Sequence, residues 1–130
     1  MKEKISKPKK TKIKTERESQ IQQKIMLEIS KNPMNLVVRR NVGQFKTIDD
    51  RYIFIGQVGE ADVQGIIGNQ KCKNCGHEIH PLPFAIEVKD EKNEQTDEQI
   101  LWQKSTWERR GGLYILARSV EDAMKGLGLI

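Results

Sequence analysis

The amino-acid sequence predicts an α/β fold in which a central mixed sheet is flanked by helices. Its 130 residues, 36% hydrophobic and 32% charged, suffice for one core and one compact domain. Helical and strand-like segments alternate, and a helix expected between two strands at 98–114 favours a parallel pair joined by a crossover. No apolar run approaches the ~18 residues of a membrane span. We therefore expect no membrane partner. The lysine-rich N-terminus shows no apolar stretch of a secretory signal, and two cysteines in a Cys-x-x-Cys pair suggest metal or redox chemistry more than disulfides, so a cytoplasmic location is expected.

The first half of the chain predicts one helix and three strands. Ile21, Ile25 and Ile29 recur at helical spacing within 15–31, and the Asn-Pro pair at 32–33 ends this helix. Strands are expected at three apolar segments, 35–39, 52–55 and 61–67. Turns or loops are expected between them, at 41–43 and 48–51.

The second half predicts two further strands and two helices. A fourth strand is expected at 84–89, after a polar, irregular stretch at 69–82. The remaining elements are a helix capped by Thr96 or Asp97, a strand and a short helix, expected at 96–110, 113–117 and 119–126. Trp102 and Trp107 lie five residues apart on the first of these helices. At that spacing they should not share a face, and core positions are expected for both.

The basic charge of the chain lies at its N-terminus. Residues 1–17 hold eight Lys/Arg and two Glu, a net +6, whereas the rest holds fifteen Lys/Arg and sixteen Asp/Glu, a net −1. Residues 1–14 offer almost nothing to bury, so we expect a disordered tail ahead of a domain at 15–130. Lys9, Lys10 and Lys12 can neutralise nucleic-acid phosphates. A solubilising leader explains the tail equally well.

A carboxylate and an ammonium close the fourth expected strand. Glu87 and Lys89 should project from one face because alternate strand residues share a face, while Ile86 and Val88 point into a core. Taken alone, such a triplet indicates a solvated ion pair. Asp62 is a second candidate, because it opens a glycine-flanked apolar strand. Two carboxylates on adjacent strands can chelate one Mg²⁺.

Six short motifs follow one another between about residues 15 and 126. They are Glu18 with Ile21-Gln22, Arg40-Asn41-Val42-Gly43, Gly59-Glu60-Ala61-Asp62, Ile86-Glu87-Val88-Lys89, Gln99-Ile100-Leu101-Trp102 and Gly111-Gly112. In this order they resemble the VRR-NUC (virus-type replication-repair nuclease) domain of the PD-(D/E)xK nuclease superfamily. The resemblance implies a restriction-endonuclease-like core with the element order αβββαβ.

The resemblance also implies a metal site for Mg²⁺ or Mn²⁺. Asp62 and Glu87 would be its side-chain ligands, and Val88 would contribute its backbone carbonyl. Glu18 is implied as an additional ligand or water-holding group from the first helix. Alternatively, Glu18 is an ordinary residue of the helix surface.

Two further residues receive catalytic roles from the resemblance. Lys89 would orient or activate the attacking water and stabilise charge on the phosphate, and Gln99 would orient Lys89 or the phosphate. A plain first-turn polar residue is the other interpretation of Gln99. Arg39 and Arg40 are candidates for phosphate contacts, since guanidinium groups clamp phosphates in a bidentate manner. They can equally be solvent-facing strand residues.

A cysteine- and histidine-containing insertion at 69–82 departs from the family pattern. Cys72 and Cys75 form a Cys-x-x-Cys-Gly loop of the kind that wraps a zinc ion, and His77 and His80 are two further potential ligands. We expect at most three of the four to reach one metal. Such a zinc would be structural; a hairpin tip with free thiols is the alternative.

The function that the resemblance implies is metal-dependent endonucleolytic hydrolysis of DNA. Similar stand-alone domains suggest branched DNA such as Holliday junctions, a homodimer with two sites, and roles in replication, recombination or repair. The alternative is a catalytically inactive nucleic-acid-binding protein with a nuclease-like fold and a zinc loop. The residues do not exclude RNA as the substrate.

Overall fold

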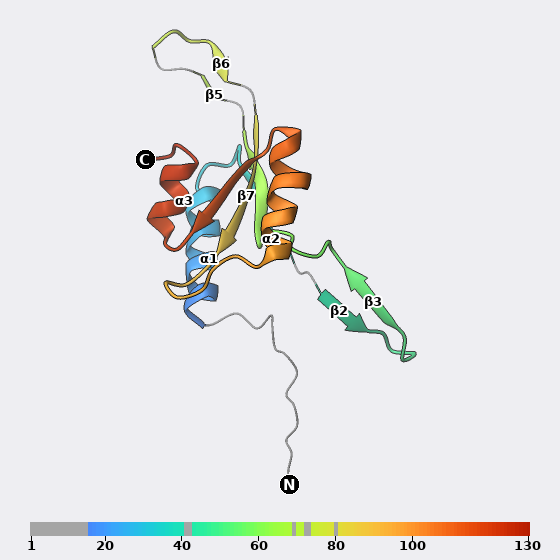
Figure 1. Cartoon of the computed structure of the whole chain (residues 1–130). Helices are drawn as coiled ribbons and strands as arrows, with labels where there is room; N and C mark the ends of the chain where they lie inside the picture. The colour runs from blue at the N-terminus through green and yellow to red at the C-terminus, as the bar shows by residue number, and fades with distance from the viewer. Residues whose placement is uncertain (1–15, 41–42, 69, 72–73, 80) are drawn as a thin grey trace.

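A four-stranded sheet with helices on both faces forms the centre of the molecule (Figure 1). The computed structural model describes residues 16–40, 43–68, 70–71, 74–79 and 81–130. In chain order the elements are α1 (Glu16–Ser30), β1 (Leu36–Arg39), β2 (Gly43–Lys46), β3 (Tyr52–Ile55), β4 (Val63–Ile67), β5 (Gln70–Lys71), β6 (Glu78–Ile79), β7 (Leu82–Val88), α2 (Asp97–Leu101), η1 (Trp102–Trp107), η2 (Glu108–Arg110), β8 (Leu113–Ala117) and α3 (Val120–Gly126). None of the helices among these residues is long and apolar enough to cross a membrane.

The central sheet is mixed, as the sequence predicts. Its strand order is β1-β4-β7-β8, with antiparallel pairing of β4 to both β1 and β7, and parallel pairing of β7 to β8. The parallel pair is joined through the helical segment at 97–110, which confirms the expected crossover. In the register of β4 and β7, Val63 lies opposite Ile86, so Asp62 lies beside Glu87 at the end of the ladder.

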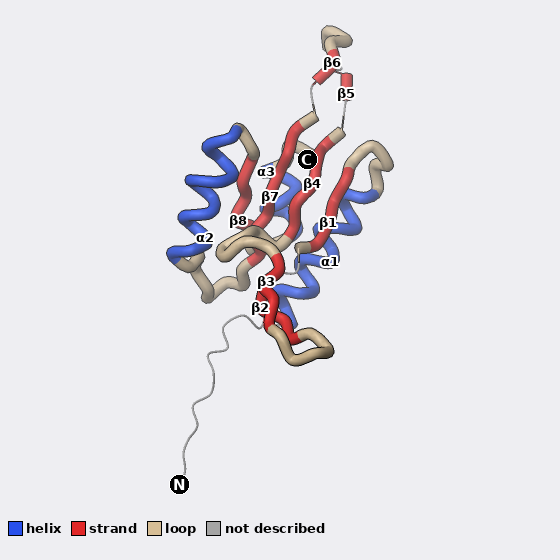
Figure 2. The backbone as a smooth tube through the Cα atoms, turned by 90° about the vertical axis from the view of Figure 1, so that its right-hand side faces the viewer, coloured by secondary structure: helices blue, strands red, loops and turns tan. Residues whose placement is uncertain are grey.

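Two apolar layers hold the sheet. Helices α1 and α3 cover one face, where the isoleucine stripe of α1 joins alternate residues of β7 such as Ile86 and Val88 in the main core. The helical segment at 97–110 covers part of the other face (Figure 2), where Trp102 packs with Ala85 of β7 and Tyr114 of β8. Strand β7 is therefore buried on both faces, which explains its nearly continuous apolar sequence.

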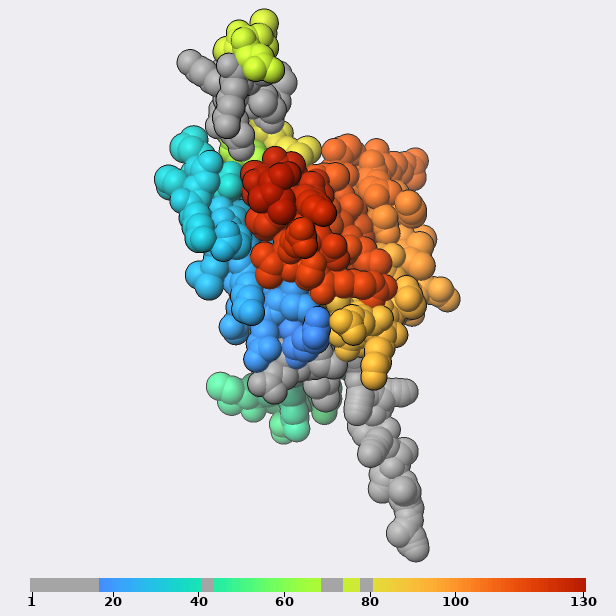
Figure 3. All heavy atoms as spheres, turned by 90° about the vertical axis from the view of Figure 1, so that its left-hand side faces the viewer, coloured from blue at the N-terminus to red at the C-terminus, as the bar shows by residue number. Residues whose placement is uncertain are grey.

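Strand β3 is not part of the central sheet. It pairs with β2 in a separate antiparallel hairpin. Because β2 begins at Gly43, the turn expected at 41–43 is wrong at that residue. All four side chains of β3 are apolar and would suit a buried strand, yet all four are exposed. A second small hairpin, β5–β6, lies within the segment expected to be irregular. Figure 3 shows the two hairpins protruding from opposite ends of the molecule.

The helical segment at 97–110 changes its winding along its length. An α-helical turn leads into the π-helix η1 and then into the 3-10 turn η2, after which Gly111 adopts the left-handed conformation (φ 91°). A π-helix, with hydrogen bonds from i to i+5, has more residues per turn than an α-helix, so positions five residues apart come closer to the same side. Trp102 and Trp107 consequently stack, with ring centroids 5.2 Å apart and an interplanar angle of 20°. The prediction that they cannot share a face is wrong, although both do pack in the second core cluster.

Candidate active site

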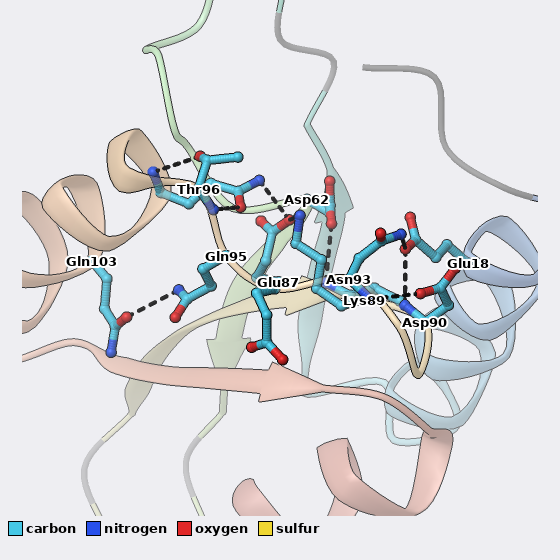
Figure 4. A network of polar contacts seen from close by, with 12 residues as sticks. Glu18, Asp62, Glu87, Lys89, Asp90, Asn93, Gln95, Thr96 and Gln103 are labelled. Carbon is cyan, nitrogen blue, oxygen red and sulfur yellow. Dashed lines mark hydrogen bonds and ion pairs between the residues drawn. The ribbon is translucent and has the colours of Figure 1, made fainter. Parts of the chain in front are cut away.

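Three of the predicted site residues gather at one end of the central sheet. Asp62 precedes β4, Glu87 lies near the end of β7 and Lys89 follows that strand, all on the face covered by the helical segment at 97–110. Ile86 and Val88 enter the main core on the opposite face, as the strand alternation predicts. Figure 4 shows the group lying between the helix start at Thr96 and Glu18.

Glu87 is the centre of this group. Its residue surface is 1% exposed, and one carboxylate oxygen, Oε2, accepts a hydrogen bond from the Gln99 amide at 2.9 Å. The Lys89 ammonium lies 3.8 Å from the same oxygen, and its side chain is 12% exposed. A charged carboxylate at this depth requires such partners, because burial without them is costly. The contact of Gln99 is with Glu87 and not with Lys89.

Asp62 is fixed to the neighbouring strand. Its Oδ2 accepts a hydrogen bond from the Val88 backbone N–H at 3.0 Å, and its backbone carbonyl accepts one from Arg40 N–H at 2.8 Å. The first bond ties the Asp62 carboxylate to the residue between Glu87 and Lys89. The two acidic groups therefore belong to one rigid end of the sheet.

Gln99 links the start of α2 to the sheet. Its Oε1 accepts from the Thr96 backbone N–H at 2.9 Å, while the Thr96 side chain accepts from Gln99 N–H, which completes a capping box. The other end of the same amide donates to Glu87. The cap at Thr96 is as predicted. The Gln99 side chain therefore completes the capping box and also holds the Glu87 carboxylate.

A turn at 57–60 presses against the same helix start. Gly59 has φ +83°, and a Cβ placed there would lie 2.1 Å from the Glu98 carbonyl oxygen. Gln57 accepts a hydrogen bond from the Trp102 indole at 2.8 Å. The turn therefore approaches the residue directly before Gln99 at a distance that only a glycine allows.

Glu60 clamps this turn to β1 and β4. Burial opposes its ionisation, but hydrogen bonds from Gln57 N–H, the Gln64 amide and the Arg40 guanidinium outweigh burial and lower the Glu60 pKa. The Arg40 contact is 2.7 Å long. Arg40, a candidate for phosphate, thus has a structural partner at its Nε, while Arg39 is exposed. The candidate lysines Lys9, Lys10 and Lys12 lie outside the described residues.

Tyr114 is a neighbour of the site that the sequence did not single out. Burial raises its pKa, and the negative charges of Glu87 and Asp62 raise it further, whereas a hydrogen bond from Gln95 opposes the shift. That bond is 3.0 Å long, and Gln95 also donates to Gln103 at 3.0 Å. The Tyr114 hydroxyl therefore stays protonated, and the negative charges of Glu87 and Asp62 both act on it.

Glu18 is buried, at 5% exposure, so it is not an ordinary residue of the helix surface. Its Oε2 accepts hydrogen bonds from Asp90 N–H at 2.8 Å and from the Asn93 amide at 3.2 Å. Arg118, which the sequence analysis missed, donates to the carbonyls of Asp90 and Asn93 and holds the same loop. Across the part of the chain that the structure describes, no three His, Cys, Asp or Glu side chains gather as a metal-holding group, and the role of Glu18 as an additional ligand stays a prediction.

The cysteine loop is described in part. His77 Nδ1 lies 3.4 Å from Cys75 Sγ at an exposed position, and Gly76 between them has φ +74°. A thiol and an imidazole are both zinc donors. Cys72 and His80 lie outside the described residues, so the four-residue ligand set stays a prediction.

Comparison with protein-family models, with curated proteins and with solved structures finds no match. The chemistry of the site therefore carries the functional argument. The end of the sheet holds two carboxylates, one ammonium and one primary amide, fixed by Asp62, Glu87, Lys89 and Gln99. Such a set can bind a hard divalent cation through oxygen and an anionic substrate through nitrogen.

Proposed function

We propose that this chain is a metal-dependent endonuclease of the PD-(D/E)xK superfamily, similar to VRR-NUC domains, that hydrolyses phosphodiester bonds in DNA. Branched DNA is the expected substrate. The observation that carries the proposal is the arrangement around Glu87, whose buried carboxylate meets Gln99 at 2.9 Å and Lys89 at 3.8 Å beside Asp62. A surface ion pair would not require a helix cap to orient it.

The donor set fits Mg²⁺ or Mn²⁺. Asp62 and Glu87 offer carboxylate oxygens, and the Val88 carbonyl is the backbone candidate between them. When bound, such an ion neutralises phosphate charge and lowers the pKa of a bound water. Glu18 is a further candidate ligand; its hydrogen bonds from Asp90 N–H and the Asn93 amide are both accepted by Oε2.

The chain's own side chains supply the remaining functions. The Lys89 ammonium, held beside Glu87, can hold a water or a phosphate oxygen and stabilise developing negative charge. Gln99 keeps the Glu87 carboxylate in one orientation. Pre-organisation of this kind places charge before the substrate arrives, which lowers the reorganisation required in the transition state.

The direct test is a panel of labelled linear, flapped and four-way DNA, incubated with the protein and Mg²⁺ or Mn²⁺. We expect cleavage of the branched forms that EDTA abolishes, with 5′ phosphate and 3′ hydroxyl ends. Binding of all forms without cleavage would support the inactive nucleic-acid binder instead. Including an RNA four-way junction distinguishes the two nucleic acids.

Deleting residues 1–14 should weaken DNA binding while the domain stays folded. The segment contains seven lysines, and lysine–phosphate contacts act through counterion release, so the loss should be greatest at low salt. Fluorescence anisotropy between ~50 and 200 mM salt measures both affinity and salt slope. An unchanged slope would identify the tail as a leader without a role in binding.

If Cys72 and Cys75 hold a zinc ion, purified protein should carry about one zinc per chain or a simple fraction of one. Structural zinc contributes folding free energy, so Cys75→Ser and Cys72→Ser should each lower the melting temperature. DNA cleavage should fall much less, since the loop supplies no oxygen ligand. Metal analysis of protein prepared without chelator or nickel is the measurement. If no zinc is found and the cysteine variants melt at the same temperature as the unmodified protein, the loop is not a zinc site.

A further inference from the structure

One face of the β2–β3 hairpin gathers two aromatic rings and two side chains that donate hydrogen bonds. The register places Tyr52 opposite Lys46 and Phe54 opposite Gln44, so these four side chains share one side, here called the aromatic hairpin face. Tyr52 is 63% exposed and Phe54 is 51% exposed, whereas the apolar side chains on the other side of the hairpin are 43–47% exposed. Adjacent exposed rings rimmed by polar side chains mark an interaction site.

The hairpin projects from the active-site end of the central sheet (Figures 1 and 2). Its two connections to the body are Arg40, ahead of β2, and Gln57, after β3. Both donate to the Glu60 carboxylate, the Arg40 guanidinium at 2.7 Å and the Gln57 backbone N–H at 3.0 Å. The Glu60 side chain is only 6% exposed and lies two residues before Asp62. A buried clamp therefore fixes the base of the hairpin beside a proposed metal ligand.

We propose that the aromatic hairpin face binds unpaired nucleotides of a DNA strand that leads into the active site, an inference that rests on the proposed nuclease function. Alternate residues of a β-strand lie about 6.8 Å apart along the strand. Bases in a stack are about 3.4 Å apart, so this separation admits one base between the rings of Tyr52 and Phe54. Stacking uses the flat face that every base has, and the contact therefore tolerates any sequence.

The length of the hairpin sets how much unpaired DNA is required. Phe54 lies three residues and Tyr52 five residues from Gln57, so at most about 10 and 17 Å of strand separate the two rings from the base of the hairpin. A DNA strand with one nucleotide per ~3.4 Å covers these distances in about three to five nucleotides. We therefore expect the substrate to carry an unpaired strand of at least about five nucleotides beside the scissile bond.

Charge favours DNA as the occupant. The hairpin is neutral over 43–56, but its Lys46–Asp50 pair, 3.3 Å long, joins side chains that are 55% and 80% exposed, so it is weak and Lys46 can turn to a phosphate. Helix α1 begins at the same end of the molecule (Figure 1), where Glu18 accepts from Asp90 N–H. Residues 1–15, ahead of α1, carry seven lysines and one glutamate, a net +6. Phosphates complement this charge, and stacking adds the preference for unpaired bases.

Fluorescence anisotropy without added divalent metal tests the surface independently of cleavage. The probes are an oligothymidylate of about 15 nucleotides and a duplex of the same length. Tyr52→Ala and Phe54→Ala should each weaken oligothymidylate binding roughly 5- to 150-fold, while duplex affinity changes less than about 2-fold. Phe45→Ala removes a ring from the other side of the same hairpin and is the matched control, which should bind both probes like the unmodified protein. Circular dichroism verifies folding.

Conservative variants separate stacking from apolar contact. Tyr52→Phe and Phe54→Tyr keep an aromatic face and should retain oligothymidylate affinity, whereas Tyr52→Leu and Phe54→Leu should lose it as the alanine variants do. Full affinity in the leucine variants, an equal loss for duplex and single strand, or tighter binding of oligouridylate than of oligothymidylate would overturn the proposal. So would a dimer that the alanine variants dissociate in sedimentation velocity without any change in DNA affinity, because the occupant would then be a second copy.

Flap length separates this proposal from the nuclease function itself. With flaps of about 2, 5 and 10 nucleotides, the unmodified protein should cleave the two longer forms much faster, and the double variant Tyr52→Ala/Phe54→Ala should lose that difference. Cleavage that ignores flap length and both rings would overturn the role of the hairpin while the nuclease function stands. Absence of all cleavage, with oligothymidylate binding that still depends on both rings, would refute the nuclease function and leave the single-strand surface.

Discussion

Replacing Lys89 by alanine should lower DNA cleavage by about 10³-fold while DNA binding changes little. The ammonium lies 3.8 Å from Glu87 within the proposed site, whereas the excess positive charge of the chain lies in residues 1–17. Single-turnover cleavage with excess enzyme measures the rate, and anisotropy measures binding. The proposed chemistry therefore predicts a large loss in rate without a matching loss in affinity.

The control for charge is Lys92→Ala, which removes a lysine from the exposed loop directly after the strand. It should cleave at close to the unmodified rate. Because Lys89 is mostly buried, Lys89→Met, which keeps an apolar stem, serves if the alanine variant loses stability. Undiminished cleavage by a folded Lys89 variant would show that this end of the sheet is not the active site.

Substituting Gly59 by alanine should cost at least about 3 kcal/mol of stability, from strain at positive φ and from overpacking. The added Cβ would lie 2.1 Å from the Glu98 carbonyl oxygen, so the turn or the helix start must move. In a domain of this size the melting temperature should fall by about 10 °C or more. Because Glu98 precedes Gln99, the displacement should also disturb the bond to Glu87 and lower the cleavage rate.

Gly111→Ala is the matched comparison for this effect. Gly111 has φ +91°, close to the +83° of Gly59, but a Cβ there would meet nothing within 4 Å. It should therefore show the backbone strain alone, roughly 1–2 kcal/mol, with cleavage preserved. Thermal melts of the two variants separate strain from collision. Equal losses in both would show that the contact between Gly59 and Glu98 contributes nothing beyond conformation.

The elements of the central domain follow closely from periodicity, whereas the place of β3 does not. The Ile21, Ile25 and Ile29 stripe defines α1, because a stripe at helical spacing has one way to be buried. Strand β3 has four consecutive apolar residues, which suit a buried strand and an exposed hairpin equally. Its partner β2 has the sequence Gly-Gln-Phe-Lys, in which the alternation of apolar and polar residues is too weak to predict a strand.

The candidate site could be predicted in its residue types but only partly in its contacts. Strand alternation places Glu87 and Lys89 together without further information. The contact between Gly59 and Glu98 depends on how a turn and a helix start meet in space, which local pattern does not encode. The hydrogen bond between Tyr114 and Gln95 likewise joins a strand to a loop that is remote in sequence.

The side chain of Gln99 restricts which amino acid can occupy its position. One end must accept, because it faces the Thr96 backbone N–H, and the other must donate, because it faces the Glu87 carboxylate. Glutamate has the right length but only acceptors when ionised, and lysine has only donors. Asparagine has the right polarity but is one methylene shorter. Glutamine combines this reach with one donor end and one acceptor end in a single amide, so a substitution at position 99 that keeps only one of the two ends gives up either the helix cap or the bond to Glu87.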